Sequence, residues 1–178
     1  MITKQQFKEN SEKTLQAFEK AGIALTEKER NEIEVADFNL SDLNRVGLQL
    51  LVYVNTERVC AKEMYLLPNQ TCPQHRHIIT AGKQGKEETF RCRKGLCYLY
   101  VEGEGKKEDA RAKIPPTDVD VFHEIVLYPG QEYTIKPYTW HWFQAGENGA
   151  IISEFSTHST DETDEFLDKR ILRAPEVR

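Results

Sequence analysis

The most constraining feature of this sequence is the period of its apolar residues between positions 44 and 156. There they alternate with polar residues, which gives a period of two instead of the 3.6 of a helix. The stretch VGLQLLVYVN (46–55) alternates in this way, and RVCAKEMYLLP (58–68) follows after a short turn. Pro, Gly and Asn residues punctuate these segments. Short alternating segments at close spacing predict an antiparallel β sandwich or barrel.

Further strands are predicted along the rest of this region. They cover residues around 75–90 and the segments 88–103, 123–130, 131–137, 141–146 and 149–156. The intervening GEGKKEDARAKIPPTDVD (103–120) is polar and contains adjacent prolines, so we expect a long exposed loop there. The fold class is therefore mainly β.

The N-terminal segment has a different pattern. Residues 3–34 are expected to be helical, with capping boxes that begin at Thr3 and Thr26. One helical face carries Phe7, Leu15 and Phe18. This face should pack on the rest of the domain or on a second subunit.

The 178 residues are enough for one domain with a hydrophobic core. We expect a single domain over residues 1–178, with a helical segment 1–40, a β barrel at about 44–158 and a charged C-terminal tail. The tail, STDETDEFLDKRILRAPEVR, is interpreted as a solvated terminal segment, with docking on a partner subunit as the alternative.

Composition excludes several classes of function. The net charge of −5 gives no basic surface for nucleic acid or anionic lipid. No apolar run approaches the roughly 20 residues of a membrane span, and the polar N-terminus lacks a secretory signal. We expect a cytoplasmic protein whose four cysteines (Cys60, Cys72, Cys92 and Cys97) are reduced.

A group of histidines and one glutamate suggests a metal site. His75 and His77 are two residues apart, so both imidazoles lie on one face of a strand. Glu88 begins the next strand and alternates inward with Phe90 and Cys92. A carboxylate on such a face needs a partner, because an isolated buried charge is costly. A divalent cation is such a partner.

A fourth ligand is available in YTWHWFQAG, where His141 lies among aromatic residues. If His141 points inward, Trp140 and Trp142 point outward. The predicted ligand set is therefore His75, His77, Glu88 and His141, which suits Mn²⁺, Fe²⁺, Co²⁺, Ni²⁺ or Zn²⁺ and leaves about two open positions in an octahedron. Of the other two histidines, His123 is expected to contact the edge of the core or solvent, and His158 is expected at the surface, as is Glu87.

The order of these residues resembles that of the cupin superfamily. The pattern H-x-H, E-x6-G and a later H is met by His75 and His77, by Glu88 with Gly95, and by His141. The resemblance implies a jelly-roll, or double-stranded β-helix, barrel with the metal inside. The gap between His77 and Glu88 is longer than the usual cupin gap, and residues 136–141 depart from the usual second motif.

Both departures are accommodated by a closer resemblance. VGLQLLVYVNTERVCAKEMYLLPNQTCPQHRH, GKEETFRCRKG, LYVEGE and HWFQAGE are similar to the bacterial D-lyxose ketol-isomerases, over roughly residues 20–170. That resemblance implies a cupin homodimer that holds Mn²⁺. It also implies interconversion of D-lyxose and D-xylulose, with D-mannose and D-fructose as a related pair.

Aldose–ketose isomerisation through a cis-enediol needs a cation at the two sugar oxygens and a base beside C1 and C2. Glu154 shares an apolar face with Ala150 and Ile152, and Lys62 shares one with Cys60 and Met64. A buried carboxylate can exchange a proton near neutral pH, so Glu154 is the preferred base. Lys62 would donate to a sugar oxygen or to Glu154. A purely structural Lys62–Glu154 ion pair is the alternative.

Two other functions fit the same ligand set. One is a non-haem iron cupin dioxygenase, and the other is a non-catalytic sugar-binding cupin. The aromatic residues Phe90, Tyr98, Tyr100 and Phe143 could line a sugar pocket or belong to the barrel core.

Overall fold

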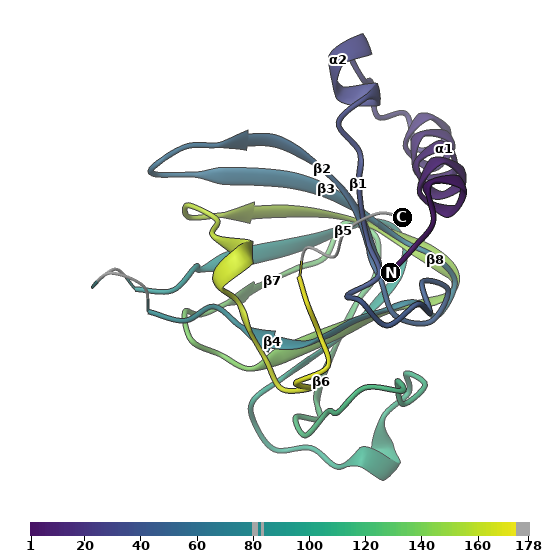
Figure 1. Cartoon of the computed structure of the whole chain (residues 1–178). Coiled ribbons are helices and arrows are strands. Elements are labelled where there is room, and N and C mark those ends of the chain that lie inside the picture. The colour runs from purple at the N-terminus through teal and green to yellow at the C-terminus, as the bar shows by residue number, and fades with distance from the viewer. Residues whose placement is uncertain (80–81, 83, 174–178) are drawn as a thin grey trace.

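The computed structural model describes residues 1–79, 82 and 84–173. Helices lie outside a curled antiparallel sheet (Figure 1). The elements are α1 (Lys4–Lys20), α2 (Glu27–Arg30), β1 (Glu34–Ala36), β2 (Leu48–Asn55), β3 (Cys60–Leu66), β4 (Thr71–Arg76), β5 (Glu88–Val101), η1 (Lys107–Asp109), β6 (His123–Leu127), β7 (Glu132–Ile135), β8 (His141–Ser156), η2 (Asp161–Thr163) and β9 (Glu165–Phe166). The mainly β fold predicted from the period of two is confirmed.

Two long strands, β5 and β8, form the centre of the sheet. They pair antiparallel along their length, from Glu88 opposite Ser156 to Val101 opposite His141. The C-terminal half of β8 also pairs with β3, and its N-terminal half pairs with β4. Strands β6 and β7 extend the other edge of β5. Because β8 has different neighbours at its two ends, the sheet curls around one apolar core.

The strands predicted at 141–146 and 149–156 form one strand, β8, instead of two. Where the sequence predicted a break between two strands, the pairing of β8 with β5 shifts its register, between Gly95 and Cys97 of β5. Gly95 has a φ of +78°, and a Cβ atom there would lie 2.0 Å from the carbonyl oxygen of Gly149. A glycine is therefore required where the two long strands come together.

Helix α1 packs against the outer face of the sheet, as its apolar face predicts. Both predicted capping boxes are present, at Thr3 and Thr26. Phe18 is fully buried in an apolar cluster with Leu51 and Ile151 of the sheet. The N-terminal segment is not helical throughout, however, because residues 34–36 form strand β1 and pair with β2.

The loop predicted as exposed over residues 103–120 is only partly so. Its first half is exposed, but Ala112 is buried against a stacked pair formed by Tyr100 and Trp142, whose ring centroids are 4.1 Å apart. The indole of Trp142 donates to the carbonyl of Val121 over 2.8 Å. Trp142 is therefore covered by this chain's own loop and offers no surface to a second subunit.

The C-terminal segment, defined here as residues 159–173, is neither a solvated tail nor free to dock elsewhere. It runs across the sheet near β4 (Figure 1), and β9 pairs with β4 through Phe166 opposite His75. Phe166 and Ile171 enter the main apolar core. The expectation of a solvated tail fails because the buried apolar side chains of this segment are spaced irregularly along the sequence.

All four cysteines are buried and unpaired, as expected from the sequence. Among the described residues, no helix is both long and apolar enough to cross a membrane.

Candidate metal centre

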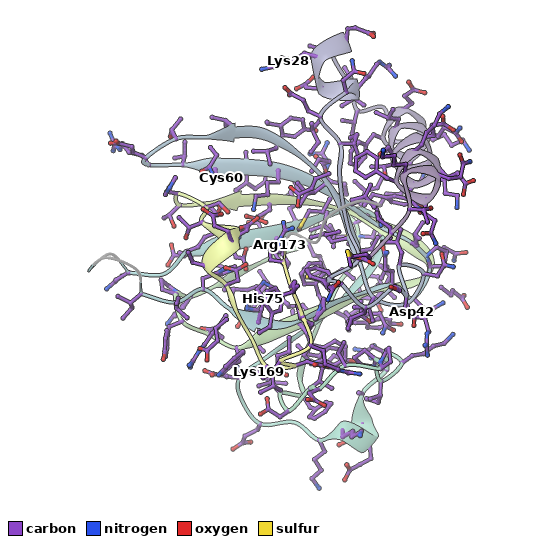
Figure 2. All side chains as sticks on the ribbon, in the orientation of Figure 1. Lys28, Asp42, Cys60, His75, Lys169 and Arg173 are labelled. Carbon is purple, nitrogen blue, oxygen red and sulfur yellow. The ribbon has the colours of Figure 1, made fainter. Side chains whose placement is uncertain are left out.

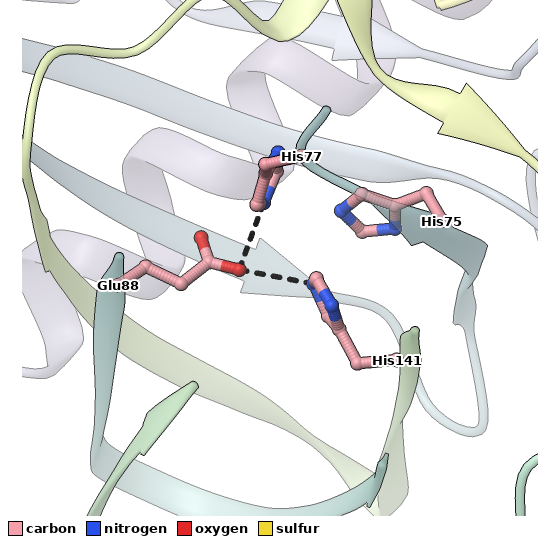
Figure 3. A group of neighbouring side chains, drawn as sticks. All are labelled: His75, His77, Glu88 and His141. Carbon is pink, nitrogen blue, oxygen red and sulfur yellow. Dashed lines mark hydrogen bonds and ion pairs between the residues drawn. The ribbon is translucent and has the colours of Figure 1, made fainter. Parts of the chain in front are cut away.

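Three histidines and one glutamate converge inside the curled sheet (Figure 3). His75 lies in β4 and His77 just beyond it, while Glu88 and His141 are the first residues of β5 and β8. All four side chains are buried, and one ligand atom from each lies within 4.8 Å of the others. The structure therefore brings together the four residues that the sequence pattern selected.

The imidazole rings are oriented by hydrogen bonds on the side away from the cluster. Nδ1 of His75 lies 2.8 Å from the carbonyl oxygen of Pro73, and Nδ1 of His141 lies 2.9 Å from that of Thr139. Nδ1 of His77 lies 2.6 Å from the carboxylate of Asp164. These contacts leave the Nε2 atoms for the centre of the cluster. Histidines that ligate metals in proteins are oriented in this way, with the second ring nitrogen bound to a carbonyl or carboxylate.

The charges of the cluster also suit a cation. Oε1 of Glu88 lies 3.0 Å from Nε2 of His77 and 2.9 Å from Nε2 of His141. The angles of the second contact do not meet those of a hydrogen bond, so Nε2 of His141 is buried and has no hydrogen-bond partner in the described part of the chain. Three imidazoles and a carboxylate fit a divalent transition metal, which would satisfy that atom.

The pKa values describe the cluster without such an ion. Burial lowers the pKa of His77, but the neighbouring Glu88 and Asp164 outweigh burial and raise it to about 9. Burial and the two other imidazoles hold the pKa of His75 well below its usual value. His77 therefore carries a proton that a metal ion would replace, because a metal ligand must be deprotonated.

The two residues predicted for proton transfer lie beside this cluster. Lys62 of β3 and Glu154 of β8 are opposite each other in the sheet, and Nζ of Lys62 is 3.4 Å from Oε1 of Glu154. Both side chains are only 3% exposed. The alternation of both strands placed them correctly on the inner face.

Sequence reasoning missed a second buried lysine, Lys86. Its ammonium lies 2.8 Å from Glu88 and 2.9 Å from Glu154, so it connects the metal cluster to the proposed base. Burial alone would lower the pKa of Lys86, but Glu154 and Glu88 raise it well above its usual value. A signal was available, because Lys86 is two residues before Glu88 and extends the inward alternation of β5 by one step.

The C-terminal segment supplies three further charged residues that sequence reasoning also missed. Asp161 accepts from Lys62 over 2.7 Å, Asp164 binds His77, and Arg173 lies 3.3 Å from Asp161. Arg173, like His75, lies towards the middle of the molecule, whereas Lys28 is at its edge (Figure 2). No periodic signal marks these residues, because the segment is mostly irregular.

The aromatic residues divide between the two faces of the sheet. Phe90 and Phe143 line the cavity beside the cluster. Tyr98 and Tyr100 do not, because they pack on the outer face with Trp142 and the loop above it. The surface residues are as expected, since Glu87, His123 and His158 are exposed.

The arrangement combines two chemical elements in one closed site. The first is a ligand set that can hold a divalent cation. The second is a network that can donate and accept protons, formed by the buried Lys62, Lys86 and Glu154 and the partly exposed Asp161. A cation next to a paired acid and base suits reactions that move a proton beside a carbonyl group.

Known proteins with similar structures support the fold. The L-ribose isomerase of Cellulomonas parahominis aligns with a TM-score of 0.77 over 99% of this chain and 98% of that chain, at 14% sequence identity. At this identity the likeness concerns the fold alone, and it confirms the predicted cupin barrel.

Sequence comparisons reach much closer relatives. The D-lyxose/D-mannose isomerase of Thermosediminibacter oceani is 58% identical over 99% of both chains. The D-lyxose ketol-isomerase of a Thermofilum species is 52% identical, again over 99% of both chains. The family model described as D-lyxose isomerase matches residues 5–178. The chain therefore belongs to the D-lyxose isomerase family.

Proposed function

We propose that this protein is a metal-dependent aldose–ketose isomerase that interconverts D-lyxose with D-xylulose and D-mannose with D-fructose. Both relatives, at 58% and 52% identity, carry D-lyxose in their names, and the first also carries D-mannose. The observation that carries the proposal is the buried His75–His77–Glu88–His141 cluster next to a lysine-bound carboxylate, Glu154. A metal-dependent aldose–ketose isomerase that works by proton transfer needs both parts.

The cluster residues would hold the ion through three Nε2 atoms and the carboxylate of Glu88. A divalent ion, when bound, supplies a Lewis acid that favours negative charge on the two sugar oxygens during the reaction. The buried walls, which include Phe90 and Phe143, exclude water from the reacting carbons.

Glu154 is proposed as the base that takes the proton from C2 of the aldose and returns it to C1. Atoms and charge balance because two protons move through the cis-enediol: the carbon proton passes from C2 to C1 by way of Glu154, and the hydroxyl proton on O2 passes to O1. Lys86 and Lys62 hold the Glu154 carboxylate at 2.9 and 3.4 Å and can donate to sugar hydroxyl oxygens. General base catalysis of this kind contributes about 10²–10⁴-fold in rate.

The experiment is incubation of purified, metal-loaded protein with D-lyxose under air and under argon, with D-xylulose as the measured product. We expect D-xylulose in both atmospheres and its loss after chelation. Absence of product from D-lyxose and from a panel of other pentoses and hexoses would refute the isomerase. Turnover that required oxygen would point to a dioxygenase instead.

Three finer expectations accompany this function. We propose Mn²⁺ as the resident ion, as the resemblance to the D-lyxose isomerases implies; it is one of the divalent transition metals that three imidazoles and a carboxylate suit. We also propose a homodimer in the cytoplasm. Tyr53 and Phe155 are 40% and 50% exposed, which leaves aromatic surface on the sheet for a partner. Elemental analysis of protein purified without added metal, and sedimentation equilibrium, test the ion and the dimer.

A further inference from the structure

The space beside the metal cluster is too small for a sugar. Only about 20 Å³ is open there to a water-sized molecule, which is room for roughly one water. Pockets that bind small ligands have volumes of about 300–1,000 Å³. The reacting end of an aldose could lie at the cluster only if the rest of the molecule extended elsewhere.

A second pocket lies beside the first and is much larger, about 240 Å³. Three charged side chains line both spaces and form the wall between them: Lys62, Asp161 and Arg173. The outer pocket is completed by Glu34, Val52, Asn55, Ser159 and Glu162. The outer pocket therefore shares one wall with the small space beside the cluster.

The wall is held by ion pairs and not by apolar packing. Asp161 lies 2.7 Å from Lys62 and 3.3 Å from Arg173, and Arg173 in turn pairs with Glu34 at 2.5 Å. Sugar hydroxyls both donate and accept hydrogen bonds, so they can take the place of either partner in such contacts. A polyhydroxylated chain could pass between the two spaces without leaving a buried charge unpaired.

The outer pocket has the chemistry of a sugar site with one apolar contact. Among the described residues that line it, only Val52 is apolar, and Val52 is 36% exposed. Asn55 is not free to move, since its side-chain amide binds both the N–H and the carbonyl of Ser159, over 3.1 and 3.0 Å. Val52 is thus the lining residue whose size can be changed without breaking a polar contact.

We propose that the outer pocket is the subsite for the end of the sugar remote from the carbonyl, and that Val52 sets the preference for chain length there. The proposal rests on the proposed function, because it places C1 and C2 at the cluster. D-mannose has the configuration of D-lyxose at C2, C3 and C4 and one further carbon at the far end. The only part that differs between the two sugars therefore falls beside Val52.

The test is calorimetric titration of D-lyxose and D-mannose into metal-loaded protein, with Val52→Trp compared with the unaltered chain. We expect the affinity for D-mannose to fall at least about tenfold more than that for D-lyxose, since one carbon in a fitted pocket is worth about 10–200-fold. Val54→Trp is the matched control. Val54 lies on the same strand and is 38% exposed, but it lines neither space, so both affinities should stay unchanged.

Val52→Ala is the second variant, in case the larger residue impairs folding. It enlarges the pocket and should shift the affinity ratio towards D-mannose. Equal effects of Val52→Trp on both sugars, no effect on either, or the absence of sugar binding by the unaltered chain would overturn the subsite. Binding with the expected ratio but no conversion of either sugar would instead refute the isomerase and leave the subsite standing.

Discussion

The barrel strands and the C-terminal segment contribute to the same site in different ways. The barrel supplies His75, His77, Glu88 and His141, all at strand ends and at most 7% exposed. The segment 159–173 supplies Asp161, Asp164 and Arg173 from a short 3₁₀ turn and irregular chain. The first group can form a metal site alone, whereas the second orients and encloses it.

The two regions also differ in how they are anchored. The barrel residues belong to long ladders, such as the pairing of β5 with β8. The C-terminal segment is attached through the short strand β9, through the 2.6 Å ion pair of Arg76 with Glu165, and through Asp168. Changes in the barrel should therefore abolish function, while changes in the segment should weaken it by degrees.

The largest effect is expected for Glu88→Ala in the barrel. It removes the one carboxylate of the proposed ligand set and leaves Lys86, 2.8 Å away, with one buried partner fewer. We expect loss of bound metal by elemental analysis and no measurable isomerisation. The matched control is Glu87→Ala, an exposed neighbour, which should retain both. Full metal content in Glu88→Ala would show that the cluster is not the metal site.

Glu154→Gln separates chemistry from metal binding within the barrel. The variant keeps the shape of the side chain but removes the proposed base, so kcat should fall about 10²–10⁴-fold while metal content is unchanged. Glu147→Gln, an exposed position on the same strand, serves as the control. A variant that kept most of its kcat would move the base to another residue.

Asp164→Asn tests whether the C-terminal segment acts on the metal site through His77. Loss of the negative charge 2.6 Å from Nδ1 should leave the ligand set intact but lower metal affinity about 10–100-fold. Competition with a coloured chelator measures the affinity, with the exposed Asp118→Asn as control. Equal affinities for Asp164→Asn and the control would mean that the segment only covers the site.

The smallest effect is expected at Asp168, one of the residues that attach the C-terminal segment to the rest of the chain. Hydrogen bonds from Arg170 lower the pKa of Asp168 to about 2. A depressed carboxylate pKa stabilises the folded state above the ordinary pKa of about 4, and this contribution disappears as pH falls towards 2. Arg170 is 63% exposed, so solvent screens its interaction with Asp168. The contribution of this pair to the free energy of unfolding is therefore about 1 kcal/mol.

Acid unfolding followed by circular dichroism checks this linkage. In Asp168→Asn the stability between pH 4 and pH 7 should be lower by that amount, and the difference should vanish near pH 2. The exposed Asp109→Asn serves as the control and should unfold like the unaltered chain. A difference that grew as the pH fell would reverse the assigned sign.

The sequence by itself determined the β architecture, the inward direction of the side chains at the strand ends of the site, and the four residues of the cluster. These depend on alternation, which is local geometry: successive side chains of a strand point to opposite sides whatever the rest of the chain does. The same rule placed Lys62 and Glu154 inside, and one more step of it would have placed Lys86 beside Glu88.

Only the tertiary structure decided what covers each face. Alternation put Trp142 outside, but the loop folded over it made it buried. Tyr100 was expected in a sugar pocket or the barrel core, and it lies on the outer face because β5 has register shifts between Cys92 and Cys97. Alternation did not predict the positions of Asp161, Asp164 or Arg173, because an irregular chain has no period from which the direction of a side chain can be inferred. Their places depend on charges already buried in the barrel, which are stable only when opposite charges come to them from elsewhere in the chain.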